Sequence, residues 1–300
     1  MNRRLAWSMM VLLAASSAGA WEMRGHSLVA HEAVLLLPEE VPEFFRQGAA
    51  TVGHASIDPD VMKHRETPQL RHREYPEHFL DYELVDEQPL PEMRYDFVAL
   101  AADRGQAPDR VGFVPYAITE NTQRLSLAFA EHRCWPEDPH IRSKALIYAG
   151  LLSHYASDMV QPLHTSVHYD GRAGADGESP RSGIHGKMDS LFLQPGFEAG
   201  AGPAAPEVFA DLWLAVRGEF EASFSQVERV YGFESNLDAL YEGGEWDPEL
   251  RRFAEERYAR TLEFLSSLYL TAWRQSESLG FWDGFTREQP DGSWKACGEE

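Results

Sequence analysis

The stretch Ile141-Arg-Ser-Lys-Ala-Leu-Ile-Tyr-Ala-Gly-Leu-Leu-Ser-His154-Tyr-Ala-Ser-Asp158-Met-Val is followed at once by Gln-Pro162-Leu-His164. Between residues 141 and 160 it is apolar on nearly every side apart from His154 and Asp158, which predicts a helix buried at the centre of the protein. His154 and Asp158 are four positions apart, so they project from one face of that helix. Pro162 ends or kinks the helix, which allows His164 to turn back toward the same space.

A second pair with the same spacing follows in Gly183-Ile-His185-Gly-Lys-Met-Asp189. An unpaired carboxylate inside an apolar helix such as that of Asp158 is costly, and a bound metal removes the cost. Imidazole and carboxylate are ligands that suit zinc. The two pairs, together with His164, therefore predict a site for more than one metal ion.

Helical periodicity continues over most of the chain, in residues 27–37, 114–132, 206–230 and 248–279. Residues 171–183 are rich in Gly, Ser, Asp and Arg and predict a loop, while residues 74–106 have few periodic cues. Alternation typical of strands is scarce. We expect an all-α fold, a single compact multi-helix domain with the metal cluster in a cleft between helices.

The first 20 residues read as a secretory signal peptide, with Arg3 and Arg4, a short apolar run, and Ala18-Gly-Ala20 as a cleavage site. Residues 21–300 would then form the catalytic domain of a secreted or periplasmic protein. Cleavage would make Trp21 the first residue. Its α-amino group, with a pKa of about 8 in free peptides, can bind zinc once deprotonated, and its carbonyl oxygen completes a chelate.

The composition agrees with a secreted, soluble protein. There are 27 basic and 48 acidic residues, and the formal net charge of −21 favours solubility and repels polyanions at long range. No second apolar run has the length of a membrane span, and no obligate protein partner is indicated. The two cysteines, Cys134 and Cys297, can form a disulfide in an oxidising compartment, but their spacing leaves open whether they approach each other.

Together the motifs resemble the trinuclear zinc phosphodiesterases. The matching features are Trp21 followed by His26, His-x3-Asp-x5-His at 154–164, and Gly-x-His-x3-Asp at 183–189. That superfamily joins zinc-dependent phospholipases C and extracellular single-strand-specific nucleases. Its other ligands are an Asp and a His between the first and third motifs, where this chain has Ser56-Ile-Asp58-Pro-Asp60 and Glu77-His78-Phe-Leu-Asp81. The resemblance runs from Trp21 to Phe192, and the C-terminal third carries no matched motif.

The resemblance implies three zinc ions. Asp60, His78, His154 and Asp158 would hold the first, and His164, His185 and Asp189 the second. The third would be held by the nitrogen and carbonyl oxygen of Trp21, by His26, and by the second oxygen of Asp158. Asp60 is favoured because it follows a proline, as the acid of the family often does, with Asp58 as the alternative.

The implied activity is hydrolysis of phosphate ester bonds by a zinc-bound hydroxide. Asp60 would orient the attacking water as well as bind metal. Lys63, three residues further on, would contact the substrate phosphate, with a solvated surface charge as the alternative interpretation.

The substrate is the harder question, because the motifs are mixed. The short spacing from Trp21 to His26 and the acid Asp189 are typical of the nuclease branch. The motifs around Asp60, His78 and His154 look more like the phospholipase C branch, which we favour. A phospholipid head group is therefore the expected substrate, single-stranded nucleic acid (as a nuclease or 3'-nucleotidase) is the alternative, and a non-catalytic metal-binding protein is a weaker alternative.

Overall fold

The protein is described here by a computed structural model that covers residues 23–174, 177–200, 202–289, 291–297 and 299. The expected all-α fold is confirmed. The α-helices are α1 (Met23–Leu35), α2 (Glu43–Gln47), α3 (Ala49–Ala55), α4 (Asp58–Met62), α5 (Pro68–Glu74), α6 (Arg94–Asp103), α7 (Pro108–Val111), α8 (Val114–Cys134), α9 (Pro139–Val160), α10 (Ile184–Asp189), α11 (Leu212–Phe224), α12 (Val227–Gly232), α13 (Glu234–Tyr241) and α14 (Pro248–Gln275). The 3-10 helices are η1 (Tyr75–His78), η2 (Tyr82–Val85), η3 (Pro162–Thr165), η4 (Leu191–Leu193) and η5 (Ser276–Ser278), and two short strands, β1 (Thr286–Glu288) and β2 (Trp294–Ala296), lie near the C-terminus.

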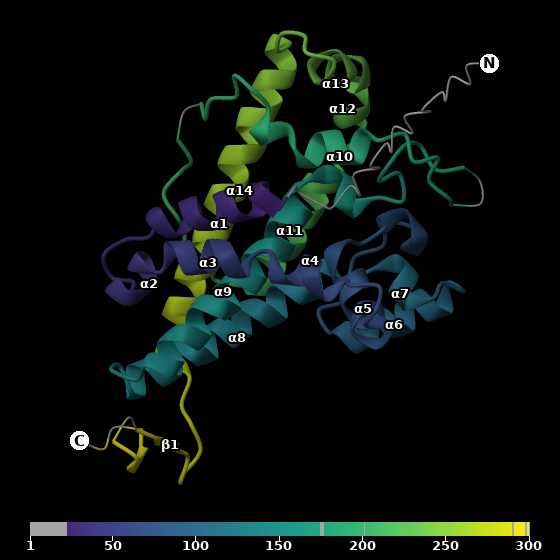
Figure 1. The fold of residues 1–300 in the computed structure, drawn as a ribbon. Helices are drawn as coiled ribbons and strands as arrows, with labels where there is room; N and C mark the ends of the chain where they lie inside the picture. Colours follow the sequence, from purple (N-terminus) through teal and green to yellow (C-terminus); the bar gives the residue numbers. More distant parts are fainter. Residues whose placement is uncertain (1–22, 175–176, 201, 290, 298, 300) are drawn as a thin grey trace, which may run out of the picture.

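Helix α9, predicted from its apolar sequence, is the central helix and packs against α8, α3 and α14 (Figure 1). It begins two residues earlier than the periodic pattern indicated. Pro139 occupies the first turn, and the carboxylate of Asp138 accepts a hydrogen bond from the His140 N–H at 2.8 Å, which caps the helix. The helix ends at Val160, ahead of Pro162. From Leu152 onward every residue of α9 is buried, including His154 and Asp158.

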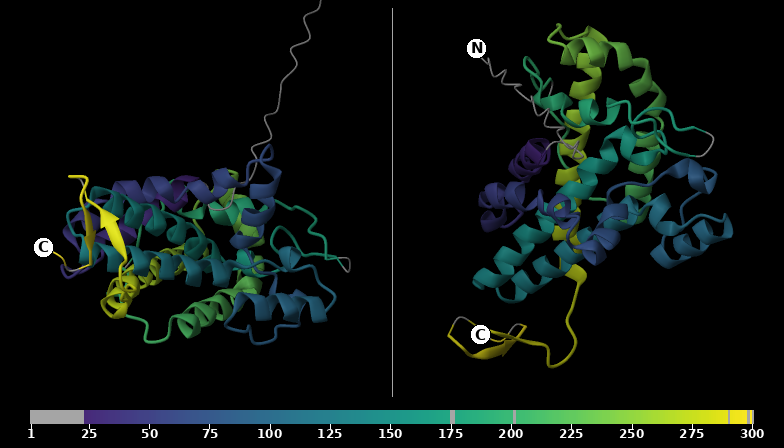
Figure 2. Two further views of the ribbon diagram at one scale, coloured as in Figure 1. Left: turned by 90° about the horizontal axis from the view of Figure 1, so that it is seen from below. Right: turned by 45° about the vertical axis from the view of Figure 1, so that its right-hand side comes forward.

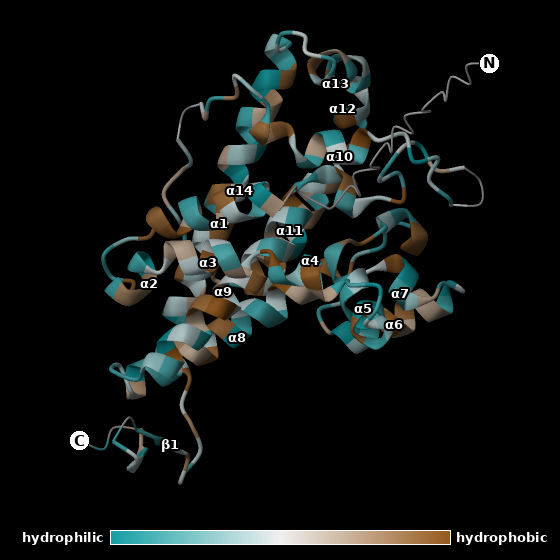
Figure 3. Cartoon of the chain, in the orientation of Figure 1, coloured by the Kyte–Doolittle hydropathy of each residue, from teal (hydrophilic) through white to brown (hydrophobic). Residues whose placement is uncertain are grey.

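The remaining long helices enclose α9. Helix α14 packs against α8, α9 and α1, and α1 packs against α3. Aromatic rings fill the space between them, with Phe45 in edge contact with Phe129 and Tyr269 at centroid distances of 5.0 and 5.7 Å. Figure 3 shows the helices banded with hydrophobic and hydrophilic residues, as expected for helices that each bury one face.

The C-terminal end of α9 is the point at which several short elements meet. Helix α4, η1 and η3 all contact α9 there. Figure 1 labels α10 far from the C-terminal hairpin, and Figure 2 shows that hairpin, in yellow, at one end of the molecule. Within the described residues, no helix combines the length and the apolar character needed to cross a bilayer.

Several elements differ from the sequence expectation. Helix α6 lies in the region with few periodic cues, and it buries only Phe97 and Ala101, so its apolar face is too narrow to be recognised. The predicted helical stretch 206–230 is divided into α11 and α12, and α11 begins at Leu212 rather than near residue 206. The preceding segment lies beside α14, where the Glu207 and Phe209 N–H groups donate to Ser267 Oγ and Thr271 Oγ1.

The two cysteines are paired, which the sequence had left open. A disulfide joins Cys134, the last residue of α8, to Cys297 just beyond β2, with their Cα atoms 4.8 Å apart. Strands β1 and β2 form an antiparallel hairpin, and the Arg287 guanidinium in β1 pairs with Glu131 of α8 at 2.8 Å. The C-terminal hairpin is therefore tied to the end of an interior helix.

Candidate metal centre

Three groups of histidine and aspartate side chains converge at the C-terminal end of α9. In each group, ligand atoms of the members lie within 4.8 Å of one another. The groups are His26, His154 and Asp158; Asp60, His78 and His154; and His164, His185 and Asp189. They come from α1, α4, η1, α9, η3 and α10, so the fold brings together residues that are far apart in the chain.

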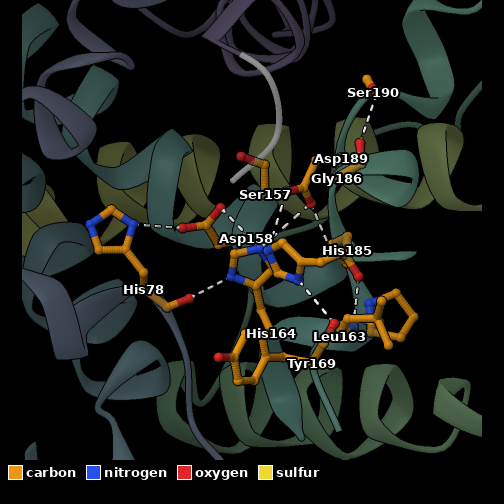
Figure 4. A network of polar contacts seen from close by, with 12 residues as sticks. His78, Ser157, Asp158, Leu163, His164, Tyr169, His185, Gly186, Asp189 and Ser190 are labelled. Carbon is orange, nitrogen blue, oxygen red and sulfur yellow. Dashed lines mark hydrogen bonds and ion pairs between the residues drawn. The ribbon is translucent and has the colours of Figure 1, made fainter. Parts of the chain in front are cut away.

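The carboxylate of Asp158 lies at the centre of the cluster, where its side chain is fully buried. One oxygen, Oδ2, is 3.0 Å from His78 Nδ1 and 3.3 Å from His154 Nε2. The other, Oδ1, is 3.4 Å from His26 Nε2 and 3.8 Å from His164 Nε2. Figure 4 shows Asp158 between His78 and the pair of rings from His164 and His185. The two oxygens of one carboxylate thus face different imidazoles, as a bridging ligand requires.

Hydrogen bonds from outside the cluster hold four of the imidazoles in one tautomer. In each, Nδ1 donates to an acceptor: His26 to Ser157 Oγ (2.8 Å), His154 to the Ser56 carbonyl (2.8 Å), His164 to the His78 carbonyl (2.8 Å), and His185 to the Tyr169 carbonyl (3.2 Å). A carbonyl can only accept, and the Ser157 hydroxyl already donates to backbone carbonyls of α9. When each of these rings is neutral, its lone pair is therefore on Nε2, which faces the cluster.

His78 has the opposite orientation. Its Nδ1 faces the cluster, 2.9 Å from His154 Nε2. Its Nε2 is buried and has no hydrogen-bond partner within the described part of the chain.

The buried acceptors of the cluster lie opposite one another. Nε2 lone pairs point at carboxylate oxygens, as between His185 Nε2 and Asp189 Oδ2 at 3.2 Å. Among the described residues, Asp158 Oδ1, His164 Nε2 and Asp189 Oδ2 are buried without a hydrogen bond. Buried acceptors that face each other are unfavourable unless a shared cation lies between them. Imidazole and carboxylate donors fit divalent metal ions such as zinc, so the residues could hold metal.

In the metal-free protein a proton on His164 would take the place of a metal cation beside Asp158 and Asp189. Burial acts to lower the pKa of His164, but the charges of Asp158 and Asp189 outweigh it and raise the pKa to about 9. Burial lowers the pKa of His26, His78 and His185, which are therefore neutral. Burial acts to raise the pKa of Asp158, but the nearby His164 and His154 bring it well below its usual value, so this carboxylate stays ionised.

Of the two candidate aspartates on α4, the structure brings Asp60 and not Asp58 into a ligand group. Asp60 Oδ1 lies 3.8 Å from His154 Nε2 and 2.5 Å from the Lys63 ammonium, with the Asp60 side chain 12% exposed. Lys63 therefore sits at the edge of the cluster and not on a remote surface. Trp21, the remaining predicted ligand, and residues 1–20 lie outside the described residues.

Sequence reasoning missed the groups that orient the candidate ligands. Gln161 donates from Nε2 to Asp189 Oδ1 at 2.8 Å and accepts the Leu163 N–H at 2.6 Å. Ser157 could have been recognised, because it lies three residues after His154 on the same helix face. The carbonyls of Ser56 and Tyr169 have no side-chain signal, so only the fold reveals them.

No protein-family model matches the chain, and no curated protein matches it in sequence. Among solved structures, the alpha-toxin of Clostridium perfringens from an avian strain aligns with a TM-score of 0.46 and 13% identity, over 90% of this chain and 67% of the toxin chain. The alpha toxin from Clostridium absonum aligns with a TM-score of 0.44 and 12% identity, over 89% of this chain and 67% of that chain. A likeness of this degree assigns neither an activity nor a ligand.

Proposed function

We propose that the protein is a secreted zinc-dependent phosphodiesterase of the phospholipase C type. The observation that carries the proposal is the sharing of one buried carboxylate, Asp158, among side chains of all three His/Asp groups. Within the described residues, the His and Asp side chains of the motifs that resemble the trinuclear zinc phosphodiesterases also meet in space. The leader-like residues 1–20 and the disulfide support secretion.

Zinc ions held by the three groups would supply Lewis-acid activation of water and of the phosphoryl group. The chain contributes the arrangement of the donors. The hydrogen bonds at Nδ1 hold four imidazoles with Nε2 directed toward the cluster, so these rings are already oriented to bind metal. Because Asp158 is ionised and fully buried, it offsets the positive charge that would otherwise collect between the groups.

Asp60 and Lys63 are the residues proposed to act on the substrate side. The Asp60 carboxylate is the more accessible acid of the cluster, at 12% exposed against 0% for Asp158 and 1% for Asp189. It would accept a hydrogen bond from the attacking water and orient it. The Lys63 ammonium, held by Asp60, would contact a phosphoryl oxygen as charge develops there.

The proposed function is tested by hydrolysis of bis-p-nitrophenyl phosphate, followed by a comparison of phosphatidylcholine with single-stranded DNA. Faster cleavage of phosphatidylcholine supports the phospholipase C assignment. Preference for single-stranded DNA would move the protein to the nuclease alternative, which the short spacing from Trp21 to His26 favours. No turnover of any phosphodiester by the zinc-loaded protein would leave a metal-binding protein without catalysis.

The exported protein is expected to contain about three zinc ions per chain, as the resemblance implies. Three His/Asp groups that could each hold an ion support this number, although two of them share His154, and the predicted third site also uses Trp21. Elemental analysis of protein dialysed against metal-free buffer measures this number. Since the ligands must be deprotonated, the metal should be lost on acidification below about pH 5. A result of one tightly bound ion or fewer at neutral pH would rule out the trinuclear assignment.

Zinc uptake by metal-free protein should release at least one proton per chain at about pH 7.5. His164, with a pKa of about 9 when no metal is bound, is protonated at that pH and must lose its proton to bind zinc. His26, His78 and His185, whose pKa values are lowered, contribute none. The contribution of His164 should vanish as the pH rises above its pKa. An indicator dye in weakly buffered solution measures the release, and zinc binding without any proton release would contradict the assignment of His164.

A further inference from the structure

A charged network lies directly behind one of the candidate ligands. Arg94 of α6 donates from Nη1 and Nη2 to the two oxygens of Glu77 at 2.7 and 2.8 Å. Its Nε donates to Glu120 of α8 at 2.6 Å. The guanidinium also lies over the Phe113 ring, 4.9 Å from the centroid. Arg94 therefore joins α6, α8 and η1 through a fork that a planar guanidinium can make and an ammonium cannot.

Glu77 is the residue immediately before His78 in η1, a 3-10 helix of four residues. Its side chain is only 6% exposed. Without Arg94 this carboxylate would either remain buried and unpaired or move toward water, and both outcomes are costly. Because η1 is so short, a displacement of Glu77 moves the backbone of His78 with it.

The position of His78 also determines that of His164. The His164 Nδ1–H donates to the His78 carbonyl at 2.8 Å, and the Leu80 N–H donates back to the His164 carbonyl at 2.9 Å. His78 and His164 belong to different ligand groups. The short segment that contains His78 thus fixes one candidate ligand directly and, through the His78 carbonyl, a second one in another group.

Residues 112–114 pack closely against the segment that contains His78 and leave it little room to adjust. Gly112 has a φ of +96°, and a Cβ built there would lie 2.1 Å from the Phe79 carbonyl oxygen. The Phe113 N–H donates to the Pro76 carbonyl at 2.7 Å and the Val114 N–H to the Phe79 carbonyl at 3.1 Å. The backbone is therefore held tightly on one side, while on the other Glu77 depends on Arg94.

We propose that Arg94 is a positioning residue of the metal centre: acting through Glu77, it holds His78 and, through the His78 carbonyl, His164 in the geometry that binds metal. This inference rests on the metal centre of the proposed function. It assigns a role in metal affinity to a side chain on α6 that touches no ligand.

The test is a metal titration of Arg94→Gln and of wild-type protein, with Zn²⁺ against a chromophoric chelator and with Co²⁺ by visible absorption. Arg94→Gln should bind at least one ion about 10- to 100-fold more weakly, the usual effect of losing an outer hydrogen-bond partner. Its Co²⁺ spectrum should change, because the geometry at His78 and His164 changes.

Arg260→Gln is the matched control. Arg260 Nη2 pairs at 2.5 Å with Glu219, whose side chain is 1% exposed, and neither residue adjoins a candidate ligand. Both variants lose a buried ion pair and should melt at lower temperature, but Arg260→Gln should keep the wild-type metal affinity and Co²⁺ spectrum. Arg94→Gln could instead bind metal as tightly as wild type while its melting temperature falls like that of the control. That result would show that Arg94 serves stability alone and would overturn the proposal.

If Arg94→Gln does not fold, Arg94→Lys decides the question. It retains the positive charge but lacks the fork, so it should fold and still bind metal more weakly than wild type. Wild-type metal affinity in Arg94→Lys would overturn the proposal. If the wild-type protein binds metal but cleaves no phosphodiester, the proposed function is refuted. The comparison of metal affinity between wild type and the Arg94 variants still tests the role of Arg94.

Discussion

Asp158→Asn is expected to lower the rate of phosphodiester hydrolysis by about two orders of magnitude or more, the scale of electrostatic effects next to reacting groups. The amide has nearly the same shape as the carboxylate, but it lacks the charge and one of the two acceptor oxygens. In the native protein those oxygens face His26 and His164 on one side and His78 and His154 on the other. A neutral side chain at this point cannot bridge two cations.

The rate with bis-p-nitrophenyl phosphate and the zinc content of the purified variant are the two measurements. Asp103→Asn, the same substitution at an exposed residue at the end of α6, is the control and should retain both values. Loss of zinc together with rate supports the bridging role. Equal damage from Asp158→Asn and Asp103→Asn, or none from either, would mean that the ligand set is misassigned.

A residue left in front of Trp21 is expected to remove one zinc ion per chain and most of the activity. The proposed third site uses the α-amino nitrogen of Trp21, and any preceding residue converts that amine to an amide without an available lone pair. His26, which lies with His154 and Asp158 in one of the three groups, would then lack its terminal partner. The fold should persist, because the other two groups do not depend on Trp21.

The comparison is between protein made in the cytoplasm as Met followed by Trp21 and protein exported with cleavage after Ala20, each verified by intact mass. Zinc content and the rate with bis-p-nitrophenyl phosphate are measured on both. One residue added after Glu300 is the control and should change neither. If the Met-extended form matches the exported form, Trp21 is a packed aromatic residue and the third site is wrong.

Some features of the centre are local and could be inferred from the order of residues. The helical repeat places His154 and Asp158 on one face of α9, and His185 and Asp189 on one face of α10, whatever the rest of the chain does. Pro162 ends α9 and so frees His164 to turn. The apolar sequence around His154 made α9 the buried central helix, and the all-α class followed from the periodicity of the remaining segments.

Other features depend on contacts between segments that are distant in the chain. Asp58 and Asp60 are chemically alike, and the packing of α4 on α9 is what brings Asp60 to His154. The pairing of Cys134 with Cys297 joins positions 163 residues apart, and spacing alone cannot show that they meet. The same is true of Arg94, whose partners lie on η1 and α8.

The histidine tautomers show most clearly which features follow from the sequence and which from tertiary contacts. Five histidines could be named as candidate ligands from their spacing and family resemblance. Each ring has two nitrogens, however, and the sequence says nothing of which one faces the cluster. Carbonyls of Ser56, His78 and Tyr169 make that choice for three of the rings by accepting their Nδ1–H groups. A backbone carbonyl is present at every residue, so only its position in the folded chain gives it this role. Local spacing and family resemblance thus name the candidate ligands, and tertiary contacts orient their rings.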